Sequence, residues 1–218
     1  MVSTNPLARI SLSQQIRDQL LDRIMRGELS PGARLIELRI AAEFATSQAP
    51  VREALRELEA MGVIETLPNK GARVRTITND ELCQLYDVRA QLESYATQLA
   101  TEKGVALKSR LKEIVRAMKK AAREEDSTAF AGENSHFHRS IVEASGNTIL
   151  LDLWENLNVQ ARTMTNVTRS RRNLMDLADS HLPIIDAIAS GDAGLANRLA
   201  KEHVLSNRPK ASKEDGQA

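Results

Sequence analysis

The sequence predicts a mainly α-helical protein with two domains of unequal size. The chain has 218 residues, which is more than one small core needs. It is 42% hydrophobic but only 3% aromatic, and its glycines and prolines are few. Apolar residues recur at three- and four-residue steps along most of the chain, which is typical of amphipathic helices. Apolar and polar residues alternate, as is typical of strands, in one short stretch.

Two short helices are predicted first. Apolar residues at three- and four-residue steps from Leu12 to Ile24 indicate one helix, which ends near Gly27. The stretch "LIELRIAAEFA" indicates a second helix that begins at about Glu37.

A third helix and a β-hairpin follow. Ser47 offers a side-chain oxygen to cap a helix that runs to about Met61. Pro50 lies in its first turn, where amide hydrogens have no partner within the helix. The stretch "VIETLPNKGARVRTI" alternates on both sides of "PNKG", as two strands joined by a tight turn do. This order predicts a winged helix-turn-helix domain over residues 8–76.

The third helix is expected to contact DNA. A major groove accepts a helix, and residues of its N-terminal turns reach the base edges. Arg52 can fork onto guanine acceptors, whereas Arg56 and Ser47 suit phosphates, and Lys70 with Gly71 at the hairpin tip suits the adjacent backbone or minor groove. The candidate DNA contacts are Arg34, Ser47, Gln48, Ala49, Arg52, Arg56, Lys70 and Gly71.

The arginines of this helix have an alternative role. The formal net charge is +1, so bulk charge does not indicate a nucleic-acid-binding protein. Arg52 and Arg56 could pair with Glu53, Glu57 or Glu59 on a solvated helix face, as most helical arginines do. The order of cap, proline, arginine, closing glycine and basic hairpin favours DNA binding.

An all-helical domain, arranged as an antiparallel bundle, is predicted over residues 78–208, followed by a disordered tail over 209–218. "TNDE" is a capping box that begins a long helix. Further helices are expected at "LKEIVRAMKKAAR", "FAGENSHFHRSIVEAS" and "ILLDLWENLNVQARTMTNV". Two more are expected at 174–190 and 193–206, around the turn "SGD".

The candidate metal ligands are Asn134, His138, His181 and His203. Asn134 and His138 are four residues apart and share a helix face. His181 and His203 lie about ten residues before and twelve after Gly191, so at about 1.5 Å per residue an antiparallel helix pair returns both imidazoles to one level. Neutral imidazoles suit Zn and Ni. The alternative for each histidine is a hydrogen bond to a neighbour, and His136, which points elsewhere, has only this role.

The N-terminal motifs resemble a known family. "APVREALRELEAMGVIETLPNKGARV" is similar to the DNA-binding domain of the GntR family of bacterial transcription regulators, which carry Pro-Val-Arg-Glu-Ala-Leu and a Pro-Asn-x-Gly wing. The resemblance covers roughly residues 10–76. The family commonly has arginine after the serine, where this chain has Gln48. Because glutamine pairs with adenine whereas arginine prefers guanine, we expect a different operator.

The C-terminal region resembles the FCD effector domain of the FadR branch of this family. Such domains commonly present Asp-x-x-x-His and two further histidines, and bind a metal that helps hold a small organic acid; "NSHFH", "SHLPIIDAIASGD" and "KEHV" match. Asn134 stands where Asp is usual, so we expect weaker or altered metal binding. Arg89 resembles an arginine that faces the cavity and could neutralise an effector carboxylate. The alternative is an exposed arginine paired to Glu93.

The leading hypothesis is a homodimeric transcriptional regulator, not an enzyme. It would bind a palindromic operator in double-stranded DNA with an affinity set by a small organic acid at or near a divalent metal, Zn or Ni. A metal-dependent hydrolase with an accessory nucleic-acid-binding module is the alternative, because three histidines can activate water. A third option is a sensor of the metal itself.

A cytoplasmic location and no membrane partner are expected. No apolar run approaches the roughly 20 residues that span a bilayer, and the start lacks the apolar core of a signal peptide. The single cysteine, Cys83, rules out an internal disulfide and fits a reducing compartment.

Overall fold

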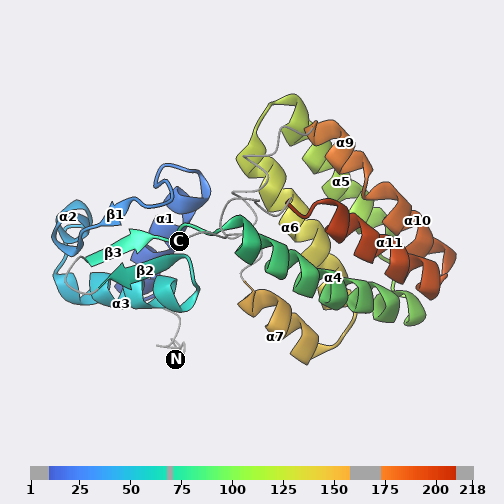
Figure 1. The fold of residues 1–218 in the computed structure, drawn as a ribbon, viewed down its shortest axis with the longest axis horizontal. Coiled ribbons are helices and arrows are strands. Elements are labelled where there is room, and N and C mark those ends of the chain that lie inside the picture. The colour runs from blue at the N-terminus through green and yellow to red at the C-terminus, as the bar shows by residue number, and fades with distance from the viewer. Residues whose placement is uncertain (1–9, 68–70, 158–172, 210–218) are drawn as a thin grey trace, which may run out of the picture. The chain divides into compact units, whose positions relative to one another are not determined.

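The computed structural model describes residues 10–67, 71–157 and 173–209. The chain divides into two compact units, Met1–Thr76 and Ile77–Ala218 (Figure 1). Three predicted features lie outside the described residues: the hairpin tip with Lys70, the C-terminal part of the helix expected from residue 149, and the tail beyond Pro209. Within the described ranges, no helix combines the length and the apolar character that a membrane span requires.

The first unit is a winged helix-turn-helix, as predicted. Its helices are α1 (Leu12–Met25), α2 (Glu37–Glu43) and α3 (Gln48–Ala60). Its antiparallel sheet has the order β1-β3-β2, with β1 at Arg34–Leu35, β2 at Ile64–Leu67 and β3 at Gly71–Val74. Ile16 and Leu20 of α1 are buried together with Val51 and Leu58 of α3, and α1 packs on α3. This core fixes which face of α3 remains outside.

The strand β1 was not predicted from the sequence. Its two residues are too few to show an alternating pattern, and the strand exists through backbone pairing with β3. Arg34 lies opposite Arg73, and Leu35 lies opposite Ala72. Leu35 is buried, whereas Arg34 is exposed. The pairing therefore places Arg34 on the outer side of the wing sheet.

Ser47 occupies the N-cap position of α3, but its hydroxyl does not accept a hydrogen bond from the helix. The predicted side-chain cap is therefore wrong. A capping side chain bonds the amide of the second or third helical residue, and here the third residue is Pro50, which has no amide hydrogen. The exposed hydroxyl of Ser47 is left free of the helix and can meet another partner.

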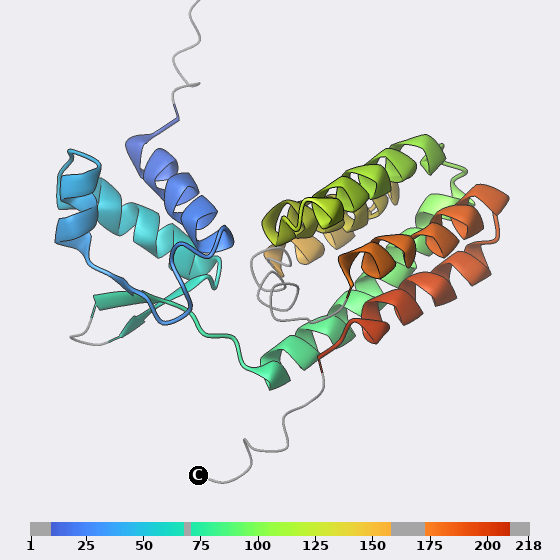
Figure 2. The same ribbon diagram turned by 90° about the horizontal axis from the view of Figure 1, so that it is seen from above.

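The second unit is an all-helical bundle, as predicted. The helices are α4 (Asn79–Glu102), α5 (Lys108–Arg123), α6 (Ser127–Ala144), α7 (Thr148–Asn156), α9 (Leu174–Asp179), α10 (Leu182–Ser190) and α11 (Ala193–Ser206). The long helices run side by side in nearly opposite directions, with α11 along α4 and α6 along α5 (Figure 2). The capping box forms, because Thr78 Oγ1 accepts from the Glu81 amide and Glu81 reaches back.

The helix predicted over 174–190 is two helices. The first, α9, ends at Asp179, and α10 begins at Leu182 with His181 as its N-cap. Pro183 is the reason, because its ring would clash with the carbonyl four residues earlier in a continuous helix. The break leaves the His181 side chain at the junction, where it is 1% exposed.

Candidate functional site

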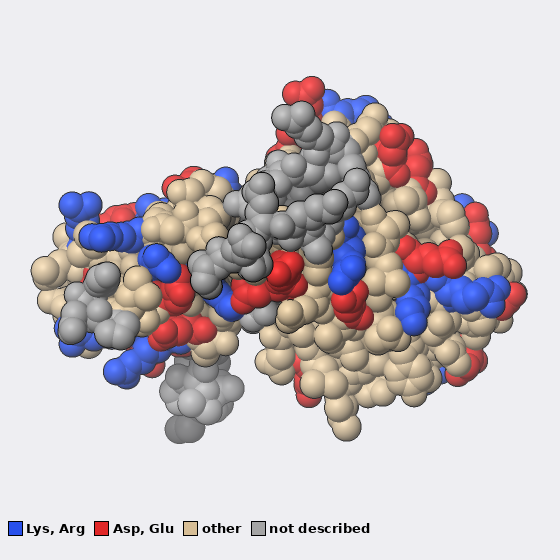
Figure 3. Space-filling view, in the orientation of Figure 1, with Lys and Arg blue, Asp and Glu red and all other residues tan. Residues whose placement is uncertain are grey.

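The outer face of α3 presents most of the predicted DNA contacts to solvent. Ser47, Ala49, Arg52 and Arg56 are exposed, and Gln48 is half-buried. Basic and acidic side chains are interspersed over the visible surface (Figure 3). With a formal net charge of +1, any attraction to DNA must come from locally placed groups.

Arg52 has a partner that the sequence did not indicate. Its Nε donates to Glu37 Oε2 of α2 at 2.7 Å, and its Nη2 donates to Gln48 Oε1 at 3.0 Å. Of the three glutamates considered as alternatives, Glu57 pairs with Arg17, and Glu59 accepts from the Thr66 amide at 2.9 Å.

The contacts of Arg52 leave it available to another ligand. Its side chain is 58% exposed, so the ion pair with Glu37 is weak and can be exchanged for another partner. Arg56 forms no ion pair within the described ranges, so its guanidinium is also open to solvent.

Three histidines converge in the second unit. His138 comes from α6, His181 from the start of α10 and His203 from α11, and one ring nitrogen of each lies within 4.8 Å of the others. All three residues are buried. Asn134, the fourth predicted ligand, lies one turn before His138 and is half-buried. His136 is exposed and lies 3.6 Å from Glu133, in keeping with its expected minor role.

The second nitrogen of each ring already faces an acceptor. The contacts of the Nδ1 atoms are Glu93 Oε2 at 2.9 Å for His138, the Leu177 carbonyl at 2.9 Å for His181 and Ser180 Oγ at 3.3 Å for His203. A proton held on Nδ1 leaves the lone pair of Nε2 available to a metal. Histidines that bind a metal through one ring nitrogen usually donate the proton of the other to an acceptor of this kind.

His181 Nε2 provides the test of whether this cluster fits a metal. The atom is buried and has no hydrogen-bond partner in the described part of the chain. Leaving a buried polar atom unpaired costs about 1 to 3 kcal/mol. A divalent ion shared with His138 and His203 would satisfy it, so the three imidazoles fit a metal site.

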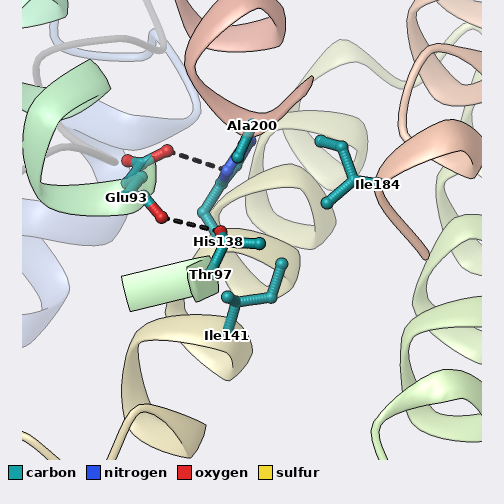
Figure 4. Close-up of a pocket in the computed structure, with 6 residues that line it drawn as sticks. All are labelled: Glu93, Thr97, His138, Ile141, Ile184 and Ala200. Carbon is teal, nitrogen blue, oxygen red and sulfur yellow. Dashed lines mark hydrogen bonds and ion pairs between the residues drawn. The ribbon is translucent and has the colours of Figure 1, made fainter. Parts of the chain in front are cut away.

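Glu93 of α4 belongs to this site, although it was not among the residues predicted for it from the sequence. Its Oε1 accepts from Arg89 Nε at 2.9 Å and from Trp154 Nε1 at 2.7 Å, and its Oε2 faces His138 (Figure 4). Both Arg89 and Glu93 are buried. A charged pair four residues apart on the apolar face of a helix was the signal that could have revealed it.

Arg89 thus matches neither sequence interpretation fully. It does pair with Glu93, but at 3% exposure the pair lies in the core and not on an exposed helix face. The guanidinium carbon also lies 5.0 Å from the centre of the Tyr86 ring. The Arg89 guanidinium is therefore already in contact with two protein groups, the Glu93 carboxylate and the Tyr86 ring.

Burial and neighbouring charges shift the pKa values of Glu93, His181 and His203. Burial would raise the pKa of Glu93, but Arg89 and His138 outweigh it and hold the pKa far below its usual value. Burial, reinforced by His138, lowers the pKa of His181 to about 3. Burial and the two neighbouring imidazoles lower the pKa of His203 well below its usual value. His181 and His203 are therefore neutral imidazoles beside an ionised Glu93 at neutral pH, and the neutral form is the one that binds metal.

The metal-free protein should lose stability as the pH falls from about 6.5 towards 3. His181 and His203 have a lower pKa folded than unfolded, so the unfolded chain binds more protons in this window. Their contribution to the free energy of unfolding is complete at pH values above 6.5, the pKa in the unfolded chain. It is lost as the pH falls from there towards the pKa in the folded state. Urea unfolding with a chelator at several pH values measures this. His181→Leu should flatten the dependence, and an unchanged slope in that variant would contradict the assignment.

Comparison with known proteins covers nearly the whole chain. Residues 12–74 match the family described as bacterial regulatory proteins, gntR family, and residues 84–206 match the FCD domain. The solved structure of a putative transcriptional regulator GntR from Rhodococcus sp. RHA1 is 23% identical with a TM-score of 0.80, over 91% of this chain and 96% of that one. The fold of both units is therefore that of this class of protein.

Two relatives are named as repressors. A probable D-xylose utilization operon transcriptional repressor from Paenarthrobacter nicotinovorans is 36% identical over 210 residues, which are 96% of this chain and 93% of the relative. A gluconate operon transcriptional repressor from Bacillus subtilis (strain 168) is 29% identical over 196 residues, which are 87% of this chain and 80% of that protein. Neither relative is named as an enzyme.

Proposed function

The chain belongs to the GntR family of bacterial regulatory proteins and carries an FCD domain, and on this premise we propose a repressor controlled by a small organic acid bound at a divalent metal. It is a transcriptional regulator, and its relatives give no support to the alternative of a metal-dependent hydrolase. The names of two relatives favour repression. We assign DNA binding to residues 8–76 and effector binding to residues 78–208, and place the protein with its DNA in the cytoplasm.

We propose that α3 reads the operator. Arg52 would leave Glu37 for the base edges, and Gln48 and Ala49 would meet neighbouring bases. Arg34, Ser47, Arg56, Lys70 and Gly71 would contact the phosphate backbone or the minor groove. The exposed position of the α3 face supports this assignment, because its opposite face is committed to the core. Two copies with two-fold symmetry would match a palindromic operator.

The convergence of three buried histidines is the observation that supports the effector proposal. His138, His181, His203 and the Asn134 amide would hold a Zn or Ni ion with four neutral ligands. The ion would then keep its full charge in a buried site, and an anionic ligand such as a carboxylate would offset it. Arg89 is the proposed second contact for that carboxylate, and it would share or exchange Glu93 to make it.

A thermal-shift screen tests the effector assignment. Gluconate and other small carboxylic acids should raise the melting temperature with Zn²⁺ or Ni²⁺ present and much less after chelation, because a ligand that binds the folded state stabilises it by mass action. D-xylose is the matched neutral compound. A shift with D-xylose that needs no metal would contradict an acid effector, and DNA affinity that responds to metal alone would make the ion the signal.

A further inference from the structure

Glu93 is the point at which three helices of the second unit meet through polar contacts. It lies on α4 and is 3% exposed. Trp154 of α7 donates to its Oε1 at 2.7 Å, and His138 of α6 places Nδ1 at 2.9 Å from its Oε2. Arg89, one turn earlier on α4, donates to the same Oε1 at 2.9 Å.

These contacts constrain the His138 ring. Glu93 Oε2 lies 2.9 Å from Nδ1 as an ion-pair contact and has no hydrogen-bond partner among the described residues, so its negative charge favours a proton on the Nδ1 atom that faces it. The ring is then fixed in orientation, with Nε2 on the opposite side. Arg89 supplies the positive charge that makes an ionised carboxylate acceptable in a buried position.

The contact with Trp154 links the same carboxylate to α7. Trp154 is 4% exposed and shares a small apolar cluster with Ala96 of α4, Val142 of α6 and Leu150 of α7. Its indole nitrogen has only one proton to donate, and that proton goes to Glu93. Any change in the charge distribution at Glu93 therefore reaches α7 directly.

We propose that Glu93 is the positioning residue of the histidine cluster and transmits its occupancy to Trp154 on α7. The inference rests on the proposed metal site. A cation at Nε2 draws electron density from the His138 ring and makes its Nδ1 proton a stronger donor to Oε2. The carboxylate then shares more of its charge with His138 and less with the indole, so the environment of Trp154 changes when metal binds.

Zn²⁺ titration of the full chain tests the proposal through two independent signals. Calorimetry reports binding, and fluorescence reports Trp154, which is the only tryptophan in the chain. Zn²⁺ suits the purpose because its filled d shell gives it no redox chemistry. In the wild type, the emission of Trp154 should change in proportion to the bound metal. Glu93→Gln should weaken Zn²⁺ binding by about 10- to 100-fold and abolish the change in emission.

Glu133→Gln is the matched control, because Glu133 also lies beside a histidine of α6, but this histidine, His136, is exposed and lies outside the buried cluster. It should leave both signals unchanged. Glu93→Gln leaves Arg89 buried without its partner, so a double variant, Arg89→Met with Glu93→Gln, removes both charges if the single variant does not fold. The double variant should show the same weakened Zn²⁺ binding, and its Trp154 emission should not change when Zn²⁺ is added.

The outcomes separate the two proposals. Wild-type protein that binds no Zn²⁺ by calorimetry overturns the metal site of the proposed function and this inference with it. Normal Zn²⁺ binding with an unresponsive Trp154, or a variant at Glu93 that binds as tightly as wild type, overturns the role of Glu93 alone and leaves the metal site standing.

Discussion

Replacing His181 by alanine is expected to abolish tight binding of Zn²⁺ or Ni²⁺. His181 supplies the one ring nitrogen of the cluster that is buried without any hydrogen-bond partner among the described residues. The loss should exceed the roughly 10- to 100-fold that removal of an outer-shell partner costs. Elemental analysis of purified protein, together with calorimetry, measures it.

Two comparisons make this result specific. His136→Ala removes an exposed histidine of α6 and should leave the metal content unchanged. Specific DNA binding by His181→Ala should persist in the absence of effector, because the substitution lies in the second unit and the reading helix in the first. Unchanged metal content in His181→Ala would mean that the ligand set is wrong.

Replacing Arg52 by alanine is expected to weaken binding to the operator by about 1 to 3 kcal/mol and to relax the base preference at one position of each half-site. The guanidinium is exposed at the N-terminal part of α3, where a helix in the major groove reaches the bases. Folding should be little affected, because the ion pair that Arg52 forms with Glu37 is exposed to solvent. Retardation assays with operators changed one base pair at a time measure both effects.

Arg56→Ala serves as the matched comparison one turn further along α3. Its proposed partner is a phosphate, so affinity should fall to a similar extent on every sequence, and the slope of log K against log salt should fall by about 1. If Arg52→Ala also lost affinity equally on every DNA sequence, Arg52 would be a backbone contact and not a reader of bases.

Local patterns in the sequence were sufficient for most helices and for the hairpin. Periodicity indicates a helix because the buried face repeats with the turn of the backbone, and the capping box at Thr78 marked the start of α4 within one residue. Periodicity could not show β1, which exists only through its pairing with β3. The periodicity also did not indicate the break between α9 and α10 at His181. Pro183 was the sequence feature that could have predicted this break.

The sequence by itself determined the family, the outward face of α3 and the histidines that meet in the second unit, because helical spacing and the turn at Gly191 are properties of neighbouring residues. Only the tertiary structure decided the partners of the charged groups. Glu93 and Trp154 are 61 positions apart, and Arg52 takes a glutamate from α2 and none from its own helix. Which carboxylate meets which donor depends on how the helices pack against one another. A local sequence pattern does not specify contacts between residues that are far apart in the chain.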